Sequence, residues 1–120
     1  MTDPVADGAR AAAERLAPDH GPGLAADVEA ALHTRGQEQR PERYFDPVSL
    51  GALIVSIATL AWTVYTDLKK RTATPSAEVV ARTVRVTRRD QGQPDAPEHV
   101  IEVVVTEAIR AAAGQEHAEG

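Results

Sequence analysis

The chain has 120 residues, a formal net charge of −5 at neutral pH and no cysteine. The absence of cysteine excludes disulfide scaffolds, thiolate metal sites and cysteine nucleophiles. Alanine occupies 22 positions, whereas the four aromatic residues all fall between positions 44 and 65. A chain this short, with so few large side chains, is not expected to build the wide core of a large self-contained enzyme.

Charge is distributed unevenly along the chain. Residues 1–47 carry a net charge of −4, residues 48–66 contain no charged side chain, residues 67–89 carry +5 and residues 90–120 carry −6. A charge-free window followed by a basic flank is typical of a membrane segment with a cytoplasmic side. A buried helix of a soluble protein that is followed by a charged helix gives the same pattern.

The acidic first third predicts a helical, partly disordered arm over residues 1–45. Asp3 and Pro4 form a typical helix start, with the aspartate as N-cap and the proline at the first helical position. Proline and glycine in residues 18–23 predict a break, after which a second short helix is expected over residues 24–35. The apolar face of the first helix is mostly alanine, which predicts weak packing and ordering on a partner. This part has no apolar run of the secretory signal type.

The segment from Val48 to Thr66 is the most informative part of the sequence. Asp46 and Pro47 repeat the N-cap and first-position signal, so a helix is expected over residues 46–71. Nineteen uncharged residues in a helix extend over roughly 28 Å, which is about the thickness of the hydrocarbon core of a bilayer. The sequence therefore predicts a transmembrane span with a basic collar.

Side chains that are typical of the membrane interface flank this segment. The predicted interface anchors are Tyr44, Phe45, Trp62, Tyr65, Lys69, Lys70 and Arg71. More basic residues follow the segment than precede it, so the positive-inside rule places the span in the inner membrane with a cytoplasmic C-terminus. A helix that lies in the interface or inserts reversibly is an alternative.

Small residues recur along one side of the same segment, and we call them the Ser/Thr seam. Its members are Ser49, Ala52, Ser56, Thr59, Thr63 and Thr66. In lipid, such a seam lets helices approach closely and form hydrogen bonds worth roughly 0.6–2 kcal/mol per pair. The seam therefore predicts a homo-oligomer in which it forms either a dry helix contact or a pore lining. In a soluble protein the seam would be the wet side of a helix, although such a side usually carries charged residues.

For residues 72–114 the sequence predicts a small cytoplasmic α+β module. The alternating, β-branched stretch over residues 83–88 and a second one over residues 99–106 predict a β-hairpin around the polar loop 90–97. A short helix is expected to follow and to end at Gly114. The predicted fold class is accordingly mainly α with a small α+β C-terminal part.

Two helices are the alternative for this region. Asp95 and Glu98 approximate a capping box, and the apolar residues that follow also fit one face of a helix that ends at Gly114. A lone hairpin is marginal in water, so either form is expected to need a partner or self-association. Residues 115–120 are expected to be a disordered tail.

No catalytic, cofactor-binding or metal-binding constellation is recognised. The four histidines, at positions 20, 33, 99 and 117, lack ligand spacing, and no phosphate-binding glycine motif or nucleophile elbow occurs. The basic run from Lys69 to Arg89 lacks interleaved aromatics and has acidic flanks, which argues against nucleic acid. Attraction to anionic lipid is the simpler use of these charges.

The stretch RYFDPVSLGALIVSIATLAWTVYTDLKKR, over residues 43–71, and the later VIEVVVTEAI, over residues 100–109, are similar to a family of small bacterial proteins. Members of that family contain one apolar helix and are encoded in conflict (immunity) gene clusters beside NTPase or protease components. The resemblance implies an effector-associated or adaptor role in antiviral defence, and it implies no catalytic residue.

These features together predict a small single-span bacterial membrane protein that self-associates through the Ser/Thr seam. It would act either as a membrane effector or pore subunit, or as an anchor or adaptor that presents residues 76–114 to a protein partner. The alternative is a soluble, cytoplasmic, homo-oligomeric interaction module with residues 47–70 as its buried helical core.

Overall fold

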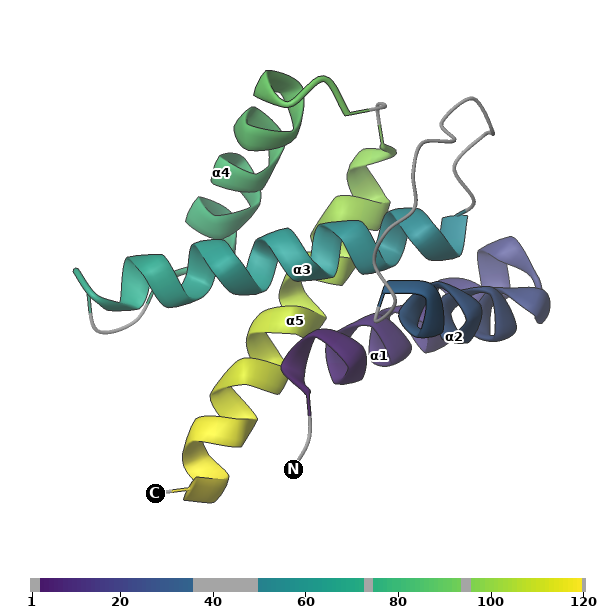
Figure 1. Ribbon diagram of the computed structural model, residues 1–120, viewed down its shortest axis with the longest axis horizontal. Helices are drawn as coiled ribbons and strands as arrows, with labels where there is room; N and C mark the ends of the chain where they lie inside the picture. The colour runs from purple at the N-terminus through teal and green to yellow at the C-terminus, as the bar shows by residue number, and fades with distance from the viewer. Residues whose placement is uncertain (1–2, 36–49, 73–74, 94–95, 120) are drawn as a thin grey trace.

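The computed structural model describes residues 3–35, 50–72, 75–93 and 96–119. Within these ranges all regular secondary structure is helical. The five helices are α1 (Pro4–His20), α2 (Gly23–Arg35), α3 (Leu50–Lys69), α4 (Ala77–Asp90) and α5 (Glu98–Glu119). Figure 1 shows α3 across the middle of the molecule, with α4 on one side, α1 and α2 on the other, and α5 crossing it.

Helix α1 begins as its sequence indicates. The Oδ1 atom of Asp3 accepts a hydrogen bond from the backbone amide of Val5 at 3.0 Å, and Pro4 occupies the first helical position, where its missing N–H costs nothing. The helix does not break at Pro18 but continues to His20. It ends at Gly21, whose φ of 97° is a backbone conformation that glycine adopts readily.

The alanine face of α1 is closely packed against α5. Ala9, Ala12 and Ala13 are completely or almost completely buried. A methyl group at Gly8 would lie 2.7 Å from the Cα atom of Ala108, so the two backbones approach more closely than larger side chains would permit. Small residues thus give α1 a tight contact rather than a weak one, and α1 and α2 belong to the same core as α3.

Helix α3 contacts each of the other four helices. Ile54, Ile57 and Ala61 are fully buried. The first described turn of α3 is capped from α2, because the Oδ2 atom of Asp27 accepts a hydrogen bond from the Gly51 amide at 2.7 Å. A methyl group at Gly51 would lie 2.5 Å from the carbonyl carbon of Asp27. The helix-start residues predicted at 46–47 lie outside the described residues.

The predicted C-terminal β-hairpin is wrong, because both of its strands are helical. In α4 the Oγ atom of Ser76 accepts a hydrogen bond from the Val79 amide at 3.1 Å and caps the helix. Val80, Val84 and Arg88, spaced by four residues, form the buried side of α4. The alternation by two that suggested a strand therefore does not match the side chains that are buried.

Helix α5 replaces the second predicted strand. Its β-branched run at residues 103–105 is buried on every side, because α5 packs against α1, α3 and α4 and each side chain finds a partner. Such tertiary packing outweighs the strand preference of valine. The helix also passes through Gly114, the predicted stop, and continues to Glu119 into the stretch expected to be a disordered tail.

The turn after α4 closes with a Schellman motif. The amide of Gln93 donates to the carbonyl of Arg88 at 3.0 Å and the amide of Gly92 donates to the carbonyl of Arg89 at 3.1 Å. Gly92 has a φ of 72°, the left-handed conformation that this motif requires at its penultimate residue. The glycine therefore ends α4 and turns the chain back toward α5.

Candidate interaction surface

The Ser/Thr seam lies on the side of α3 that faces away from the core. Ser56 and Thr63 are exposed, and Ala52, Thr59 and Thr66 are partly exposed. The sixth member, Ser49, lies outside the described residues. The structure thus places the described part of the predicted seam on one outward face.

Three hydroxyl groups of the seam donate hydrogen bonds within α3. Thr59 Oγ1 donates to the Val55 carbonyl at 2.9 Å, Thr63 Oγ1 to the Thr59 carbonyl at 3.0 Å and Thr66 Oγ1 to the Thr63 carbonyl at 3.0 Å. These protons are therefore satisfied without a second helix. The hydroxyl oxygens keep acceptor capacity for water or for donors from another molecule.

The predicted aromatic anchors do not share one environment. Trp62 is 38% exposed, whereas Tyr65 is only 6% exposed and belongs to the core. The Nζ atom of Lys69 lies 5.9 Å from the centroid of the Tyr65 ring, within the range of a cation–π interaction. Tyr44 and Phe45 lie outside the described residues.

The basic anchors extend from the end of α3 into the turn that follows. Lys70 and Arg71 are exposed. Arg71 forms an exposed ion pair with Asp67, in which Arg71 Nη2 lies 3.4 Å from Asp67 Oδ2. Such a pair contributes little to stability in water. These charges therefore form a solvated basic end of α3.

Helix α4 presents a second outward surface that the sequence interpretation missed. We call it the α4 face, and its members are Val79, Arg82, Val86 and Arg89, all of them exposed. Val79 and Val86 are 41% and 48% exposed and, with Trp62, are the exposed large hydrophobic residues in the described part of the chain. Their spacing of seven residues was the signal for this face, but the strand prediction covered only residues 83–88 and left Val79 out.

The α4 face is unpartnered because of where α4 sits. Among the described residues, α4 contacts only α3 and α5, and its buried side is directed at both. Val79 and Val86 share one side of α4, since seven residues make nearly two helical turns. Both are exposed, so this side faces away from the buried one. Nothing else in the described fold covers them.

A small cavity of about 130 Å³ lies between the end of α4 and the start of α5. Arg85, Arg88 and Arg89 contribute to its lining, and Arg85 forms an ion pair with Glu98. The Nε atom of Arg85 and the Nη1 atom of Arg88 are buried without a hydrogen bond of their own, although Arg88 has another interaction. The Arg85–Glu98 ion pair therefore links α4 to α5 beside this cavity.

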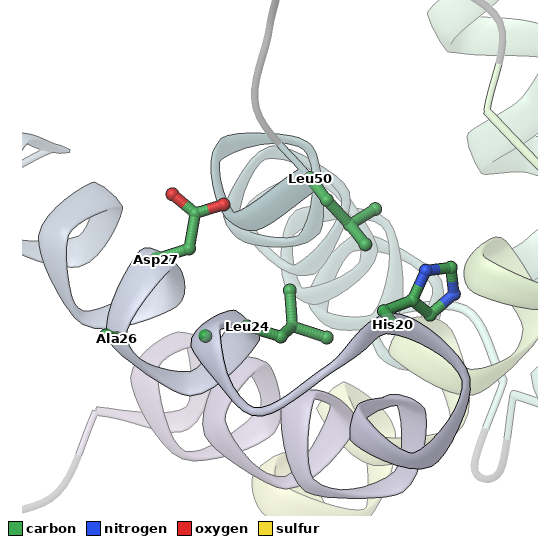
Figure 2. Close-up of a pocket in the computed structure, with 6 residues that line it drawn as sticks. His20, Leu24, Ala26, Asp27 and Leu50 are labelled. Carbon is green, nitrogen blue, oxygen red and sulfur yellow. The ribbon is translucent and has the colours of Figure 1, made fainter.

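An open hollow of about 540 Å³ lies where the α1–α2 turn meets the start of α3. Figure 2 shows His20 and Asp27 on opposite sides of it, with the apolar side chains of Leu24 and Leu50 between them. The Asp27 carboxylate already accepts the Gly51 amide. These two side chains thus do not form the hydrogen-bonded acid–base pair that general catalysis would need.

The buried carboxylate of Glu107 connects α1 with α5. Its side chain is 6% exposed, and its Oε2 atom lies 2.7 Å from Arg15 Nη1 and 3.1 Å from Arg110 Nη1. A buried carboxylate needs such partners, because desolvation without them is costly. Both arginines remain substantially solvated, so this cluster has a structural role rather than the features of a substrate site.

No protein-family model, no curated protein and no solved structure matches the chain. No group of three or more potential metal ligands occurs in the described part of the chain. In the described part of the chain one helix, Leu50–Lys69, is long and apolar enough to cross a membrane. Half of its most apolar stretch is buried inside the fold, and the core helix of a soluble protein can be equally long and apolar.

Proposed function

We propose that this protein is a non-catalytic helical interaction module in which α3 is the central packing helix, and that the Ser/Thr seam and the α4 face are its binding surfaces. The observation that carries this proposal is the contact of α3 with all four other helices. Half of the apolar stretch that made α3 resemble a membrane span is buried inside the fold, which supports this proposal. The function that follows is assembly rather than chemistry.

Burial supports the central role of α3 in energetic terms. Fully burying a side chain the size of Ile54 or Ile57 contributes about 1.5–3 kcal/mol relative to water. If α3 moved into a bilayer, its own apolar surface would still be covered. Buried residues of the other helices in the same core, among them Leu16, Val28 and Val104, would then lose the cover that α3 gives to this core. The bundle therefore satisfies both sides of each contact.

The outward position of the Ser/Thr seam favours self-association as the use of α3. The seam is exposed and carries no charge, and Trp62 lies beside it on the same helix. Small residues allow a second helix to approach closely, and the hydroxyl oxygens can accept its donors. A second copy of the chain is the partner that we propose for this side, and proteins of a conflict system remain the wider biological setting that we propose.

Placing charges on the seam distinguishes a core helix from a span. In the proposed fold Ser56→Lys with Thr63→Lys puts two ammonium groups into water, so the helical circular dichroism spectrum should be unchanged. In a bilayer each lysine near the centre of a span would cost about 2.5–3.5 kcal/mol and block insertion. The measurement is fractionation of cells with an alkaline carbonate wash, combined with circular dichroism and sedimentation of the purified chain.

We expect the unaltered protein to be released by carbonate as an oligomer, and the double-lysine variant to be released as a folded species of lower mass. Ala25→Lys with His33→Lys, two exposed positions on α2, is the matched control and should keep the oligomer. Retention of the unaltered protein in the carbonate pellet, with loss of that retention in the double-lysine variant, would establish a span and overturn the proposal.

A further inference from the structure

We propose that the α4 face docks reversibly on an anionic lipid surface, while α3 remains in the core of the bundle. This inference rests on the proposed function, because it requires α4 to be held outward by a folded bundle. The face is a single helix side that alternates valine with arginine: Val79, Arg82, Val86 and Arg89.

The geometry of the face fits a flat, charged surface. Val79 and Val86 lie on one line along the helix, and Arg82 and Arg89 form a second line beside it. From Val79 to Arg89 the face extends over roughly 15 Å at the helical rise. Apolar side chains can enter the boundary between headgroups and acyl chains while the guanidinium groups stay at the level of the phosphates.

Charge complementarity identifies lipid as the occupant. Residues 67–89 carry a net charge of +5 within a chain whose total is −5, so the rest of the molecule is repelled by an anionic surface and this segment is attracted to it. The acidic residues of α4, Glu78 and Asp90, lie at its two ends. No acidic side chain occurs between Val79 and Arg89, so nothing within this stretch offsets its attraction to an anionic surface.

The basic end of α3 adds to this attraction. Lys70 and Arg71 are exposed and precede the start of α4 by only a few residues in the sequence. Arg82 and Arg89 are exposed to solvent. By contrast, Arg85 forms an ion pair with Glu98, and Arg88 is only 4% exposed. Arg82 and Arg89 are thus the exposed arginines of α4, although Arg89 also contributes to the lining of the cavity between α4 and α5.

Vesicle flotation tests the inference with the full chain. We expect binding to vesicles that contain phosphatidylglycerol in phosphatidylcholine, weak binding to phosphatidylcholine alone, and release by high salt. Arg82→Gln with Arg89→Gln should lower the partition coefficient about 30-fold, from the loss of two bases close to the surface. Val79→Ser with Val86→Ser should also lower it, and because these side chains are exposed the melting temperature should stay within about 2 °C.

Ala25→Glu with His33→Glu is the matched control, because it lowers the net charge by the same two units on α2, which does not contact α4 among the described residues. Binding of this control should fall much less than that of the arginine variant. An equal fall in both variants, or equal binding to charged and neutral vesicles, would overturn the inference. Binding to immobilised polyglutamate but not to vesicles would assign the face to an acidic polypeptide and would also overturn it.

The outcomes separate this inference from the proposed function. A chain that is soluble and folded but does not float with anionic vesicles contradicts the docking of α4 alone. A chain that floats and then resists both high salt and carbonate has inserted α3, which contradicts the core role of that helix. Only a salt-reversible association that depends on the α4 face supports both.

Discussion

Helices α1 and α4 differ in the size of the apolar side chains that they bury and in how many of them they leave exposed. Helix α1 buries mostly alanines, and its Gly8 lies close to the backbone of α5. Helix α4 buries valines and also leaves two valines and two arginines outward. No large hydrophobic side chain of α1 is exposed, whereas two valines of α4 are.

The difference shows that apolar content alone does not reveal which helix is functional. The alanine-rich helix is the more tightly placed of the two, because small side chains allow the backbones to come close. The helix with larger side chains packs against only two neighbours among the described residues and has an unpartnered face. This difference is the reason why we propose a partner-binding role for α4 rather than for α1.

The largest expected effect comes from filling the close contact of α1. Gly8→Val places a branched side chain 2.7 Å from the Cα atom of Ala108, where backbone must move, so the free energy of unfolding should fall by about 3 kcal/mol. Chemical denaturation followed by circular dichroism measures this. Gly114→Ala on α5 is the control, since nothing lies within 4 Å of the added methyl group, and it should stabilise the protein by up to about 1 kcal/mol. A Gly8→Val variant of unchanged stability would show that α1 and α5 do not touch here.

The next largest loss of stability is expected at the ion pair between Arg15 of α1 and Glu107 of α5. Glu107→Ala removes the carboxylate that joins Arg15 to α5, and we expect a loss of roughly 1–2 kcal/mol in unfolding free energy. Arg15 is half-exposed and stays hydrated, so no buried charge is left behind. The control Arg110→Ala, which keeps the Arg15 pair, should cost less than about 0.5 kcal/mol. Equal losses in the two variants would contradict a specific link between α1 and α5.

A smaller and more local effect is expected in α4. Ser76→Ala removes the N-cap and should destabilise the first turn of α4 by about 1 kcal/mol. Because α4 packs against two helices only, amide hydrogen exchange should rise at the start of α4 before it rises in α1. Ser56→Ala, the same substitution at an exposed position within α3, should leave exchange in α4 unchanged. Uniform acceleration throughout the molecule would mean that α4 does not open separately.

The smallest effect is a pH dependence on the outer side of α1. The hydrogen bond from Arg10 Nε to Glu29 Oε2, 2.6 Å long, lowers the pKa of Glu29 below its ordinary value. The folded-state pKa is therefore below the unfolded one, so the pair stabilises the α1–α2 contact above the ordinary glutamate pKa. This stabilisation is lost as the pH falls through the folded-state pKa.

Titration of the Glu29 carboxyl group by NMR measures that shift. In Arg10→Gln the pKa of Glu29 should rise toward its ordinary value, and high salt should reduce the difference because both side chains are half-exposed. Identical titration in the two proteins would show that the ion pair does not form in solution.

The sequence predicted the helices whose signals are local. Asp3 and Pro4 mark the start of α1, and the apolar run within residues 48–66 marks α3. The environment of α3 is not a local property, since a bilayer and four packed helices satisfy the same side chains. The apolar run therefore predicts the helix but does not choose between a span and a core.

The C-terminal hairpin was predicted wrongly for a physical reason that three residues make clear. Alternation by two would put Val84, Val86 and Arg88 on one side of a strand, yet Val84 and Arg88 are buried whereas Val86 is 48% exposed. The buried positions instead follow the four-residue spacing of a helix. The α4 face was missed by the same error, because only a helix places Val79 and Val86 on one side.

The pairing of α1 with α5 also has a consequence for biosynthesis. Gly8 and Ala108 meet in the core although a hundred residues of chain separate them. While the ribosome is still making the intervening segment, α1 has no α5 to pack against, and the apolar side of α3 is only partly covered. In the proposed fold the nascent chain must therefore keep α3, the most apolar of the described helices, from aggregating or entering a membrane until α5 emerges.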